Sequence, residues 1–329
     1  MTIKIGINGL GRIGRCVIRA LVETGRKDIE IVAINGPAPI ETHIHLLKYD
    51  SVHGPFRGEV KAVGGGIDAG RGVMKLTHER DATKLDWKGV DIVLECSGKF
   101  TKRADAAGHL AQGAKKVLIS APSPDADATI VYGVNNAMLK PEHTVVSVGS
   151  CTTNCLAPVA DVLTKTFGIE AGFMTTIHSY TGDQNLVDGS HKDLRRGRAA
   201  AMAIVPTSTG AAKAIGLVIP ELKGKLGGVA LRIPTPNVSL VDLSFQSAKD
   251  TTAEEINAAM AEAANGRLKG VLGISHEPLV SIDFNHRSES SVFDSTGTSV
   301  TGKRFARVIA WYDNEWGFSC RMLDVATLL

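Results

Sequence analysis

Short apolar runs separated by segments with helical spacing fill the first half of the chain. The runs cover residues 3–7, 29–34, 90–94, 116–119 and 144–148, and a helical pattern joins the first two at about 12–23. Strands of a parallel sheet are covered on both faces, so they are apolar along their whole length instead of alternating. The first half is therefore predicted to be an α/β domain with a doubly wound parallel sheet.

The second half has longer runs in which apolar and polar residues alternate. These runs cover residues 173–178, 228–245, 280–285 and 305–312. Alternation predicts strands with one packed face, as in antiparallel sheets. We predict two domains with a boundary near Ser150: the parallel-sheet domain over 1–150, and an α+β domain with a mostly antiparallel sheet over 151–315. Helical spacing returns at 316–329, and Thr251 with Thr252 can cap a helix that starts just after them.

Composition excludes several classes of partner. The 329 residues contain 37 Lys and Arg against 34 Asp and Glu, a formal charge of +3 that is too small and too evenly spread for nucleic acid or an acidic membrane surface. No apolar run approaches the roughly 18 to 20 residues that span a bilayer, and residues 1–4 lead into a strand pattern instead of a signal peptide. We therefore expect a cytoplasmic protein.

The five cysteines are scattered along the chain. Their number is odd, and no spacing among them is typical of a zinc site or a disulfide framework, so we predict no metal. Cys16, Cys96 and Cys320 are expected to be buried thiols, and Cys155 is assigned to packing or redox sensitivity.

A glycine-rich loop follows the first strand. Gly9, Gly11 and Gly14 form a G-x-G-x-x-G pattern between a strand and a helix. Such glycines allow a tight turn, close approach of a pyrophosphate and close packing of helix on strand. The pattern predicts a Rossmann dinucleotide site. At the end of the second strand, where an acidic residue normally accepts bonds from the adenosine ribose, the chain has Asn35-Gly36-Pro37 and no carboxylate.

Cys151 lies at a predicted turn from strand to helix. In the first turn of a helix, free amides and the helix dipole lower the pKa of a thiol, so we predict that Cys151 is a nucleophile with a lowered pKa. His178 ends an alternating run, at a position that suits a base reaching across to the thiol. With ten histidines in the chain, spacing alone does not prove this pairing.

Two stretches of the second half are candidates for binding oxyanions. One is residues 207–210, which lead into a helix, and the other is residues 179–183 together with Arg195 and Arg196. Ordinary helix capping explains the first stretch equally well. Arg232 is a charge within an apolar run, which requires an anion or, alternatively, an ion pair.

Taken together, five motifs closely resemble the phosphorylating glyceraldehyde-3-phosphate dehydrogenases, from end to end of the chain. They lie at residues 7–15, 150–155, 206–214, 232–239 and 311–317. The resemblance implies reversible oxidation of D-glyceraldehyde 3-phosphate to 1,3-bisphosphoglycerate through a cysteine thioester, with hydride transfer to NAD or NADP. It also implies a homotetramer, in which the loop at about 179–203 lines a neighbour's cofactor site, and a C-terminal helix that joins the first domain.

The resemblance also implies roles for individual residues. Cys151 would be the nucleophile and His178 its partner. The substrate phosphate would bind Thr181 and Arg232, supported by Asp183. Inorganic phosphate would bind Ser150, Thr152, Arg196, Thr209 and Gly210. The dinucleotide would contact the glycine loop with Arg12 and Ile13, then Arg80, Ser120 and Asn314.

The chain departs from the NAD-using members at Gly36, where they carry Asp. Gly189-Ser190 likewise stand where many of them carry Leu-Pro, and Val148-Gly149 replace the usual Asn-Ala. We expect Gly36 to leave room for a 2′-phosphate, and Ser190 of a neighbouring subunit to offer it a hydroxyl. We therefore expect use of both NADP and NAD. Two alternatives stay open: an erythrose-4-phosphate dehydrogenase, and a non-catalytic dinucleotide-binding redox sensor.

Overall fold

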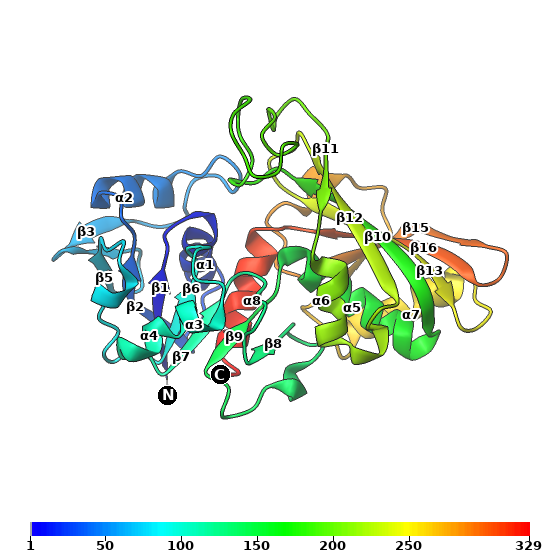
Figure 1. The fold of residues 1–329 in the computed structure, drawn as a ribbon, viewed down its shortest axis with the longest axis horizontal. Helices are drawn as coiled ribbons and strands as arrows, with labels where there is room; N and C mark the ends of the chain where they lie inside the picture. Colours follow the sequence, from blue (N-terminus) through cyan, green and yellow to red (C-terminus); the bar gives the residue numbers. More distant parts are fainter. Residues whose placement is uncertain (1) are drawn as a thin grey trace. The chain divides into compact units, whose positions relative to one another are not determined.

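The computed structural model describes residues 2–329, and these form two compact units. The first contains residues 2–150 together with 319–329, and the second is Cys151–Phe318. The division falls at the start of one helix and inside another, α8 (Trp316–Ala326), whose last residues belong to the first unit (Figure 1). No helix among residues 2–329 is long and apolar enough to cross a membrane.

The first unit is built on a nine-stranded, mostly parallel sheet. Its strands are β1 (Ile3–Asn8), β2 (Ile29–Asn35), β3 (Lys61–Val63), β4 (Gly66–Asp68), β5 (Val73–Thr77), β6 (Ile92–Glu95), β7 (Lys116–Ile119), β8 (Ala128–Thr129) and β9 (Val145–Ser147). The order is β3-β4-β5-β2-β1-β6-β7-β9-β8, and only the pairs β3–β4 and β4–β5 are antiparallel. The parallel sheet predicted from the apolar runs is confirmed.

The helices of the first unit lie between these strands in the sequence. They are α1 (Arg12–Glu23), α2 (Ile40–Lys48), α3 (Arg103–Ala106) and α4 (Gly108–Ala111), with short 3₁₀ turns at Ala82–Lys84 and Asn136–Met138. The strand order changes direction at β1, because β2 pairs on one side of it and β6 on the other. Ligands of such sheets bind outside the carboxyl ends of the strands at this switch point. The glycine loop follows β1 there.

The second unit has a seven-stranded sheet. Its strands are β10 (Ile169–Ser179), β11 (Val205–Ser208), β12 (Leu226–Ile233), β13 (Ser239–Ser247), β14 (Leu272–Ser275), β15 (Ser291–Thr301) and β16 (Phe305–Tyr312), in the order β11-β12-β10-β13-β16-β15-β14. Only the pairs β10–β12 and β14–β15 are parallel. The mostly antiparallel sheet is therefore confirmed.

Three helices pack against this sheet as one layer: α5 (Cys151–Thr166), α6 (Ala211–Val218) and α7 (Ala253–Asn265) (Figure 1). Helix α5 contacts β10, β13, β15 and β16. Helix α7 starts at a capping box, in which the Thr252 hydroxyl accepts from the Glu255 amide and the Glu255 carboxylate accepts from the Thr252 amide. The predicted cap is confirmed. A 3₁₀ turn also forms at Pro220–Leu222.

Two expectations from alternation were wrong. Residues 280–285 are not a strand, because Ser281–Phe284 form a 3₁₀ turn in which the Asp283 carboxylate accepts from the Val280 amide. Val280 and Ile282 are 59% and 69% exposed, so the alternation there does not mark a buried face. The run at 228–245 is two strands, β12 and β13, separated at 234–238, where Pro234 and Pro236 cannot donate to a strand ladder.

Candidate active site

The glycine loop of the first unit is packed so closely that side chains are excluded. A Cβ on Gly14 would lie 2.1 Å from the Gly9 carbonyl oxygen, and one on Gly9 would lie 2.5 Å from the Ser97 amide. Gly9 also has φ of +102°, which favours glycine. A Cβ on Gly11 would meet nothing within 4 Å, so that glycine faces open space. It precedes α1, whose first turn holds no acidic residue and receives no side-chain cap, as suits binding of a pyrophosphate.

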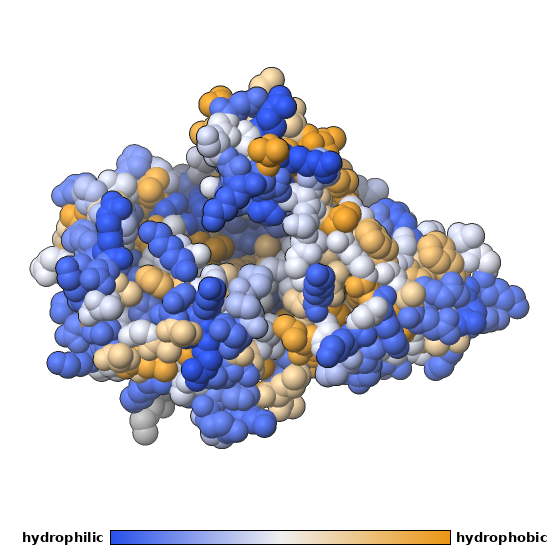
Figure 2. Space-filling model, viewed as in Figure 1, coloured by the Kyte–Doolittle hydropathy of each residue, from blue (hydrophilic) through white to orange (hydrophobic). Residues whose placement is uncertain are grey.

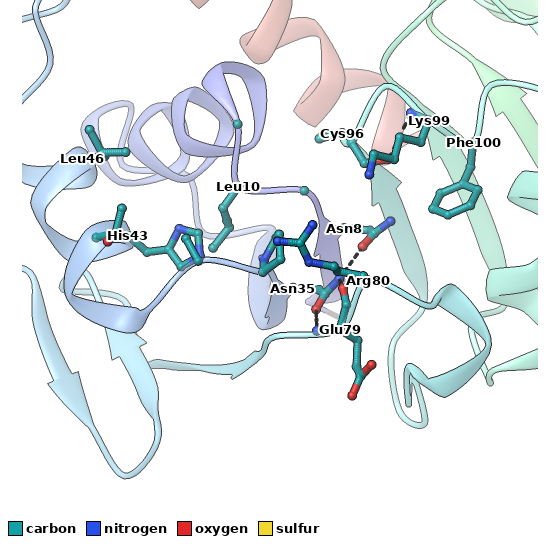
Figure 3. A pocket seen from close by; sticks show the side chains of 16 residues that line it. Asn8, Leu10, Asn35, His43, Leu46, Glu79, Arg80, Cys96, Lys99 and Phe100 are labelled. Carbon is teal, nitrogen blue, oxygen red and sulfur yellow. Dashed lines mark hydrogen bonds between the residues drawn. The ribbon is translucent and has the colours of Figure 1, made fainter.

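A cavity of about 330 Å³ opens beside this loop, within the first unit (Figure 3). Its lining comes from the ends of β1 and β2, from α2, and from the segments that follow β5 and β6. Of the residues predicted to bind the dinucleotide, Gly9, Gly11 and Arg80 line it. Arg12 forms an ion pair with Asp50 at 2.5 Å. Although burial alone would raise the pKa of Asp50, the bonds from Arg12 and from backbone amides hold it at about 2.

A buried polar network, which the sequence reading missed, supports the loop from behind. Glu95 ends β6, and its carboxylate accepts from Asn8 Nδ2 at 2.6 Å, the Ser97 amide at 2.7 Å and His109 Nε2 at 2.8 Å. Trp87 Nε1 donates to His109 Nδ1 at 3.0 Å, so Nε2 of His109 carries the proton given to Glu95. These hydrogen bonds connect β1 to the segment after β6, where the backbones of Gly9 and Ser97 are in close contact.

The structure corrects the expectation for Gly36. Asn35 and Pro37 line the cavity, but Gly36 is buried between them, and a Cβ at this position would lie 2.6 Å from Nε2 of His43. The space beside Gly36 is therefore filled by an imidazole and is not left open for a 2′-phosphate. Ser120 donates its hydroxyl to the Glu95 carbonyl, and Ser190 is exposed on a loop of the second unit.

In the second unit, Cys151 is the first residue of α5 and faces His178 on β10. The distance from Cys151 Sγ to His178 Nε2 is 3.5 Å. His178 is buried, its ring lies edge-on to the ring of Tyr312, and Cys151 is partly exposed. The pairing that spacing alone left open is thus present in the structure.

The surroundings of His178 define its tautomer. Nδ1 lies 2.7 Å from the Ser179 carbonyl oxygen, which can only accept a hydrogen bond, so Nδ1 carries the proton. Nη1 of Arg232 lies 2.9 Å from the same Nδ1 and also donates to the Ser179 carbonyl, at 3.0 Å. The Ser179 carbonyl oxygen therefore accepts from both His178 Nδ1 and Arg232 Nη1. With the proton on Nδ1, Nε2 has a lone pair directed at the thiol. His178 is therefore arranged to accept the proton of Cys151.

The expectation of a thiol with a lowered pKa is wrong. Burial raises the pKa of Cys151, and this outweighs the Arg232 charge and the amide bonds at the start of α5, which act in the opposite direction. Burial and the Arg232 charge lower the pKa of His178 to about 3. Both shifts favour the neutral thiol and the neutral imidazole, so we expect the thiolate to form by proton transfer within the pair.

Arg232 on β12 is a partly buried cation without a carboxylate partner. Among residues 2–329, no Asp or Glu forms an ion pair with it, and its Nε atom has no hydrogen-bond partner. Burial accordingly lowers the pKa of its guanidinium, although the charge of Asp183 and the nearby thiol of Cys151 oppose this effect. The ion pair considered as an alternative is absent, and the remaining interpretation is an anion supplied by a ligand.

A second arginine lies near Arg232. Arg196 donates to the Asp183 carboxylate at 2.7 Å and to the Thr207 hydroxyl at 3.0 Å, which attaches the loop at 183–196 to β11. Strand β11 pairs with β12, with Val205 opposite Arg232. Thr209 accepts from the Ala211 amide two residues later, whereas the N-cap of α6 is Gly210 and no side chain caps the helix, so the capping considered as an alternative is absent. Gly210 is exposed, and a Cβ there would meet nothing within 4 Å.

Two residues assigned from the resemblance are held in particular orientations. Asn314 Oδ1 accepts from the hydroxyls of Ser179 and Ser239, each at 2.8 Å, so the amide is fixed with Nδ2 as its remaining donor. Thr152 is buried, and its hydroxyl lies 2.9 Å from that of Tyr312. Its side chain is thus committed to the core, and any contact of Thr152 with phosphate must come from its backbone amide.

The other cysteines differ from Cys151. Cys16, Cys155 and Cys320 are buried as expected, but Cys96 is only partly buried and lines the cavity of the first unit. Burial of the thiol raises the pKa of Cys155 and of Cys96 to about 12 each. Neither of these two therefore provides a thiolate near neutral pH.

Comparison with known proteins matches both units to domains of one family. Residues 3–103 match the family model described as "Glyceraldehyde 3-phosphate dehydrogenase, NAD binding domain", and residues 150–314 match the model of the C-terminal domain of the same family. The chain is 60% identical over 329 residues to a glyceraldehyde-3-phosphate dehydrogenase of Cereibacter sphaeroides, covering 100% of this chain and 99% of that protein. It is 59% identical to one of Xanthobacter flavus (100% and 99% covered) and 54% identical to one of Geobacillus stearothermophilus (100% and 98% covered).

The position of Arg232 predicts how Cys151 titrates. Arg232→Leu should move the pH midpoint of Cys151 alkylation by iodoacetamide upward, because removing a cation makes both proton losses of the coupled pair harder. The rate of alkylation would be followed against pH, with mass spectrometry assigning the product to Cys151. Arg198→Leu, which removes an exposed arginine paired with Asp188, is the matched control. A midpoint that stays or falls in Arg232→Leu would show that this charge does not act on the thiol.

Proposed function

The chain belongs to the glyceraldehyde 3-phosphate dehydrogenase family, and from this we propose that it oxidises glyceraldehyde 3-phosphate to 1,3-bisphosphoglycerate, reversibly and with inorganic phosphate as co-substrate. The observation that carries the proposal is the contact of Cys151 with His178 at 3.5 Å, beside the unpaired cation Arg232. A nucleophile with its base and a partly buried cation form a site for an anionic, electrophilic substrate.

The reaction begins with proton transfer. His178 Nε2 takes the thiol proton, the sulfur of Cys151 forms a bond to the aldehyde carbon, and the carbonyl electron pair moves to oxygen. The imidazolium stabilises this alkoxide, as does the first free amide of α5. Each such donor contributes on the order of 3 kcal/mol to the transition state. The charge of Arg232 favours the thiolate of Cys151 and opposes a charged His178, so an anion bound to Arg232 changes both terms of this proton transfer.

When bound, the dinucleotide supplies the hydride acceptor. As the alkoxide electrons reform the carbonyl bond, the hydride leaves carbon and Cys151 is left as a thioester. An oxygen of inorganic phosphate then attacks the thioester carbon, the carbon–sulfur bond breaks, and the sulfur leaves as thiolate. The products are the acyl phosphate, the reduced dinucleotide and one proton, which His178 releases. Holding phosphate in attack geometry is worth at most about 7 to 11 kcal/mol over bimolecular attack.

We assign the two anions to separate groups of residues. The substrate phosphate binds Arg232 and Thr181, and Asp183 supports this site through its ion pair with Arg196. Inorganic phosphate binds Arg196, Thr209 and Gly210, together with Ser150 and the backbone of Thr152. The unpartnered Nε of Arg232 supports the first assignment, since a buried donor without a partner is stabilised by an anion.

We assign the dinucleotide to residues 1–150, with the C-terminal helix 316–329, and the chemistry to residues 151–315. The glycine loop, with Arg12 and Ile13, receives the pyrophosphate. Arg80 lies at the adenosine end, Ser120 lies near the nicotinamide, and Asn314 donates Nδ2 to its amide. The chain lacks the carboxylate that selects NAD at the end of β2, and we propose that it uses NADP and NAD.

We further propose that the protein is a cytoplasmic homotetramer. Several large apolar side chains are exposed on the loop near β11, and Figure 2 shows apolar atoms there at the top of the view; they are Leu186 (79%), Val187 (75%), Leu194 (87%), Met202 (86%) and Ile204 (66%). A cluster of this kind on one segment is typical of a protein interface. Ser190 lies within the same loop and in the assembly would reach a neighbour's cofactor site.

Steady-state kinetics test the function. With D-glyceraldehyde 3-phosphate, reduction of the dinucleotide should require phosphate and yield an acyl phosphate. NAD and NADP, run in parallel, should both serve, neither favoured by more than roughly the hundredfold that one charged hydrogen bond supplies. Faster turnover on erythrose 4-phosphate without phosphate would instead identify a dehydrogenase that hydrolyses its thioester. The absence of turnover on both aldehydes would leave a non-catalytic redox sensor.

Variants of the Cys–His pair test the mechanism. Cys151→Ser should abolish aldehyde oxidation while leaving dinucleotide binding intact, and His178→Gln should reduce kcat by about 10²- to 10⁴-fold, the usual contribution of a positioned base. Cys155→Ser is the matched control, one helical turn along α5, where the thiol contacts Ser291 and Ala310 in the core. Appreciable turnover by Cys151→Ser would remove this residue from the role of nucleophile.

The role of Arg232 can be tested separately by comparing kcat/KM for phosphorylated and unphosphorylated aldehydes. Arg232→Leu should reduce kcat/KM for glyceraldehyde 3-phosphate about ten- to a hundredfold more than for unphosphorylated glyceraldehyde, because only the first substrate loses a charge-assisted bond. Any effect on the thiol changes both substrates alike and cancels in this ratio. Equal losses on the two substrates would indicate that Arg232 does not hold the substrate phosphate.

A further inference from the structure

His43 on α2 is a buried imidazole without a hydrogen-bond partner. Its side chain lines the cavity of the first unit, where Figure 3 shows its ring beside Leu10, and only 4% of the residue is exposed. Among residues 2–329, no group makes a hydrogen bond of good geometry to its Nδ1 or its Nε2, although the carbonyls of Gly36 and Ala38 lie nearby. Burying both ring nitrogens unpaired is unfavourable, and a native protein retains such a group where a ligand can complete it.

The ring occupies the space where a side chain at position 36 would lie. The ideal Cβ position on Gly36 is 2.6 Å from His43 Nε2 and 2.7 Å from Cε1, both too close for atoms to coexist. Position 36 follows β2, where dinucleotide-binding domains carry the acid that holds the adenosine ribose. In sequence, Gly36 stands where the acid would be, and in space the imidazole of His43 occupies the position of a Cβ at residue 36.

The groups around His43 favour its neutral form. Burial lowers the pKa of His43, and so do the charges of His78 and of Arg15 from α1, against the nearby carbonyls of Gly36 and Ala38. His78 directs Nδ1 at those two carbonyls, at 3.2 and 2.8 Å, so that nitrogen is a donor already in use. Glu79 and Arg80 line the same cavity. A neutral His43 can accept or donate a hydrogen bond, and it can also gain a proton.

We propose that His43 is the residue that reads the adenosine ribose: turned toward the cavity, its neutral imidazole bonds the 2′-hydroxyl of NAD, and its imidazolium binds the 2′-phosphate of NADP. This proposal rests on the dinucleotide site proposed above. It assigns His43 to the adenosine ribose, for which the chain has no carboxylate at the end of β2. A phosphate carries more than one negative charge near neutral pH, so it favours the protonated ring. Binding of the 2′-phosphate then takes up a proton, whereas binding of the hydroxyl does not.

Position 36 and position 43 should also be coupled. An Asp at position 36 collides with His43, so Gly36→Asp alone either moves the imidazole or is itself turned away from the ribose. Removing the ring first clears this space. Gly36→Asp combined with His43→Ala should therefore favour the unphosphorylated ribose by more than Gly36→Asp alone does.

The test measures binding and does not depend on catalysis. ADP-ribose and its 2′-phosphorylated form would be titrated into the full-length protein by calorimetry at pH 7, in two buffers with different ionisation enthalpies. The difference between buffers gives the number of protons taken up. His43→Leu removes both functions of the ring, and His43→Asn keeps hydrogen bonding but cannot gain a charge. His45→Leu, the same substitution on the exposed face of α2, is the control.

We expect the unmodified protein to take up a proton with the 2′-phosphorylated ligand only. His43→Leu should weaken that ligand about ten- to a hundredfold relative to ADP-ribose and abolish the uptake, because one charged hydrogen bond is lost. His43→Asn should abolish the uptake while keeping the affinity for ADP-ribose, and His45→Leu should change neither. If His43→Leu fails to fold, His43→Asn alone decides.

Other outcomes separate the two proposals. Binding of both ligands with unchanged affinities and proton uptake in the His43 variants would make His43 a packing residue and overturn this inference, while the dinucleotide site would stand. Equal weakening of both ligands would likewise overturn it, since His43 would then only support the shape of the cavity. If neither ligand binds the unmodified protein, the proposed dinucleotide site itself is wrong.

Discussion

The second unit holds one partly buried charge, Arg232, that the protein itself does not neutralise. Arg232 has no carboxylate partner among the described residues, yet its guanidinium shares the Ser179 carbonyl with His178. That sharing fixes the tautomer of His178 and directs Nε2 at Cys151. The same charge lowers the pKa of both members of the pair. If an anion binds Arg232, as we propose for the substrate phosphate, it changes the charge that acts on both members of the pair, so anion binding and titration of the thiol depend on the same residue.

The two units use buried polar groups in different ways. In the first, Glu95 is fully satisfied by Asn8, Ser97 and His109, and it fixes the backbone around the glycine loop. A satisfied network of this kind rigidifies its surroundings. In the second unit, Arg232 keeps an unpartnered Nε, and in the first His43 keeps two unpartnered nitrogens. The satisfied carboxylate of Glu95 thus supports the loop, whereas the unsatisfied atoms of Arg232 and His43 face the places where we propose that ligands bind.

Sequence predicted those parts of the fold that depend on local pattern. The first strand, helix α1 and strand β7 lie where the apolar runs placed them, and the cap of α7 follows from Thr252 and Glu255. Pattern failed where burial depends on tertiary contacts: residues 280–285 alternate but turn, and the Ser- and Thr-rich strand β15 carries little apolar signal. The helix start at Cys151 was also predicted, but not the state of its thiol. Its pKa reflects how far the residue is buried, which no local motif encodes.

His43 is a second example of a property that local sequence does not reveal because it depends on a tertiary contact. The sequence reveals that Gly36 is not an acid, and from this one would infer an empty space beside the ribose. Only the packing of α2 shows that a residue seven positions later fills it. His43 and Leu47 are one helical turn apart and form the buried face of α2. From the sequence alone, His43 would therefore be interpreted as a core residue. A core residue, however, would not keep two buried nitrogens unpaired beside a cavity. A small residue at 36 and a ring at 43 are therefore one structural feature, and a change at either position alters the space available to the other.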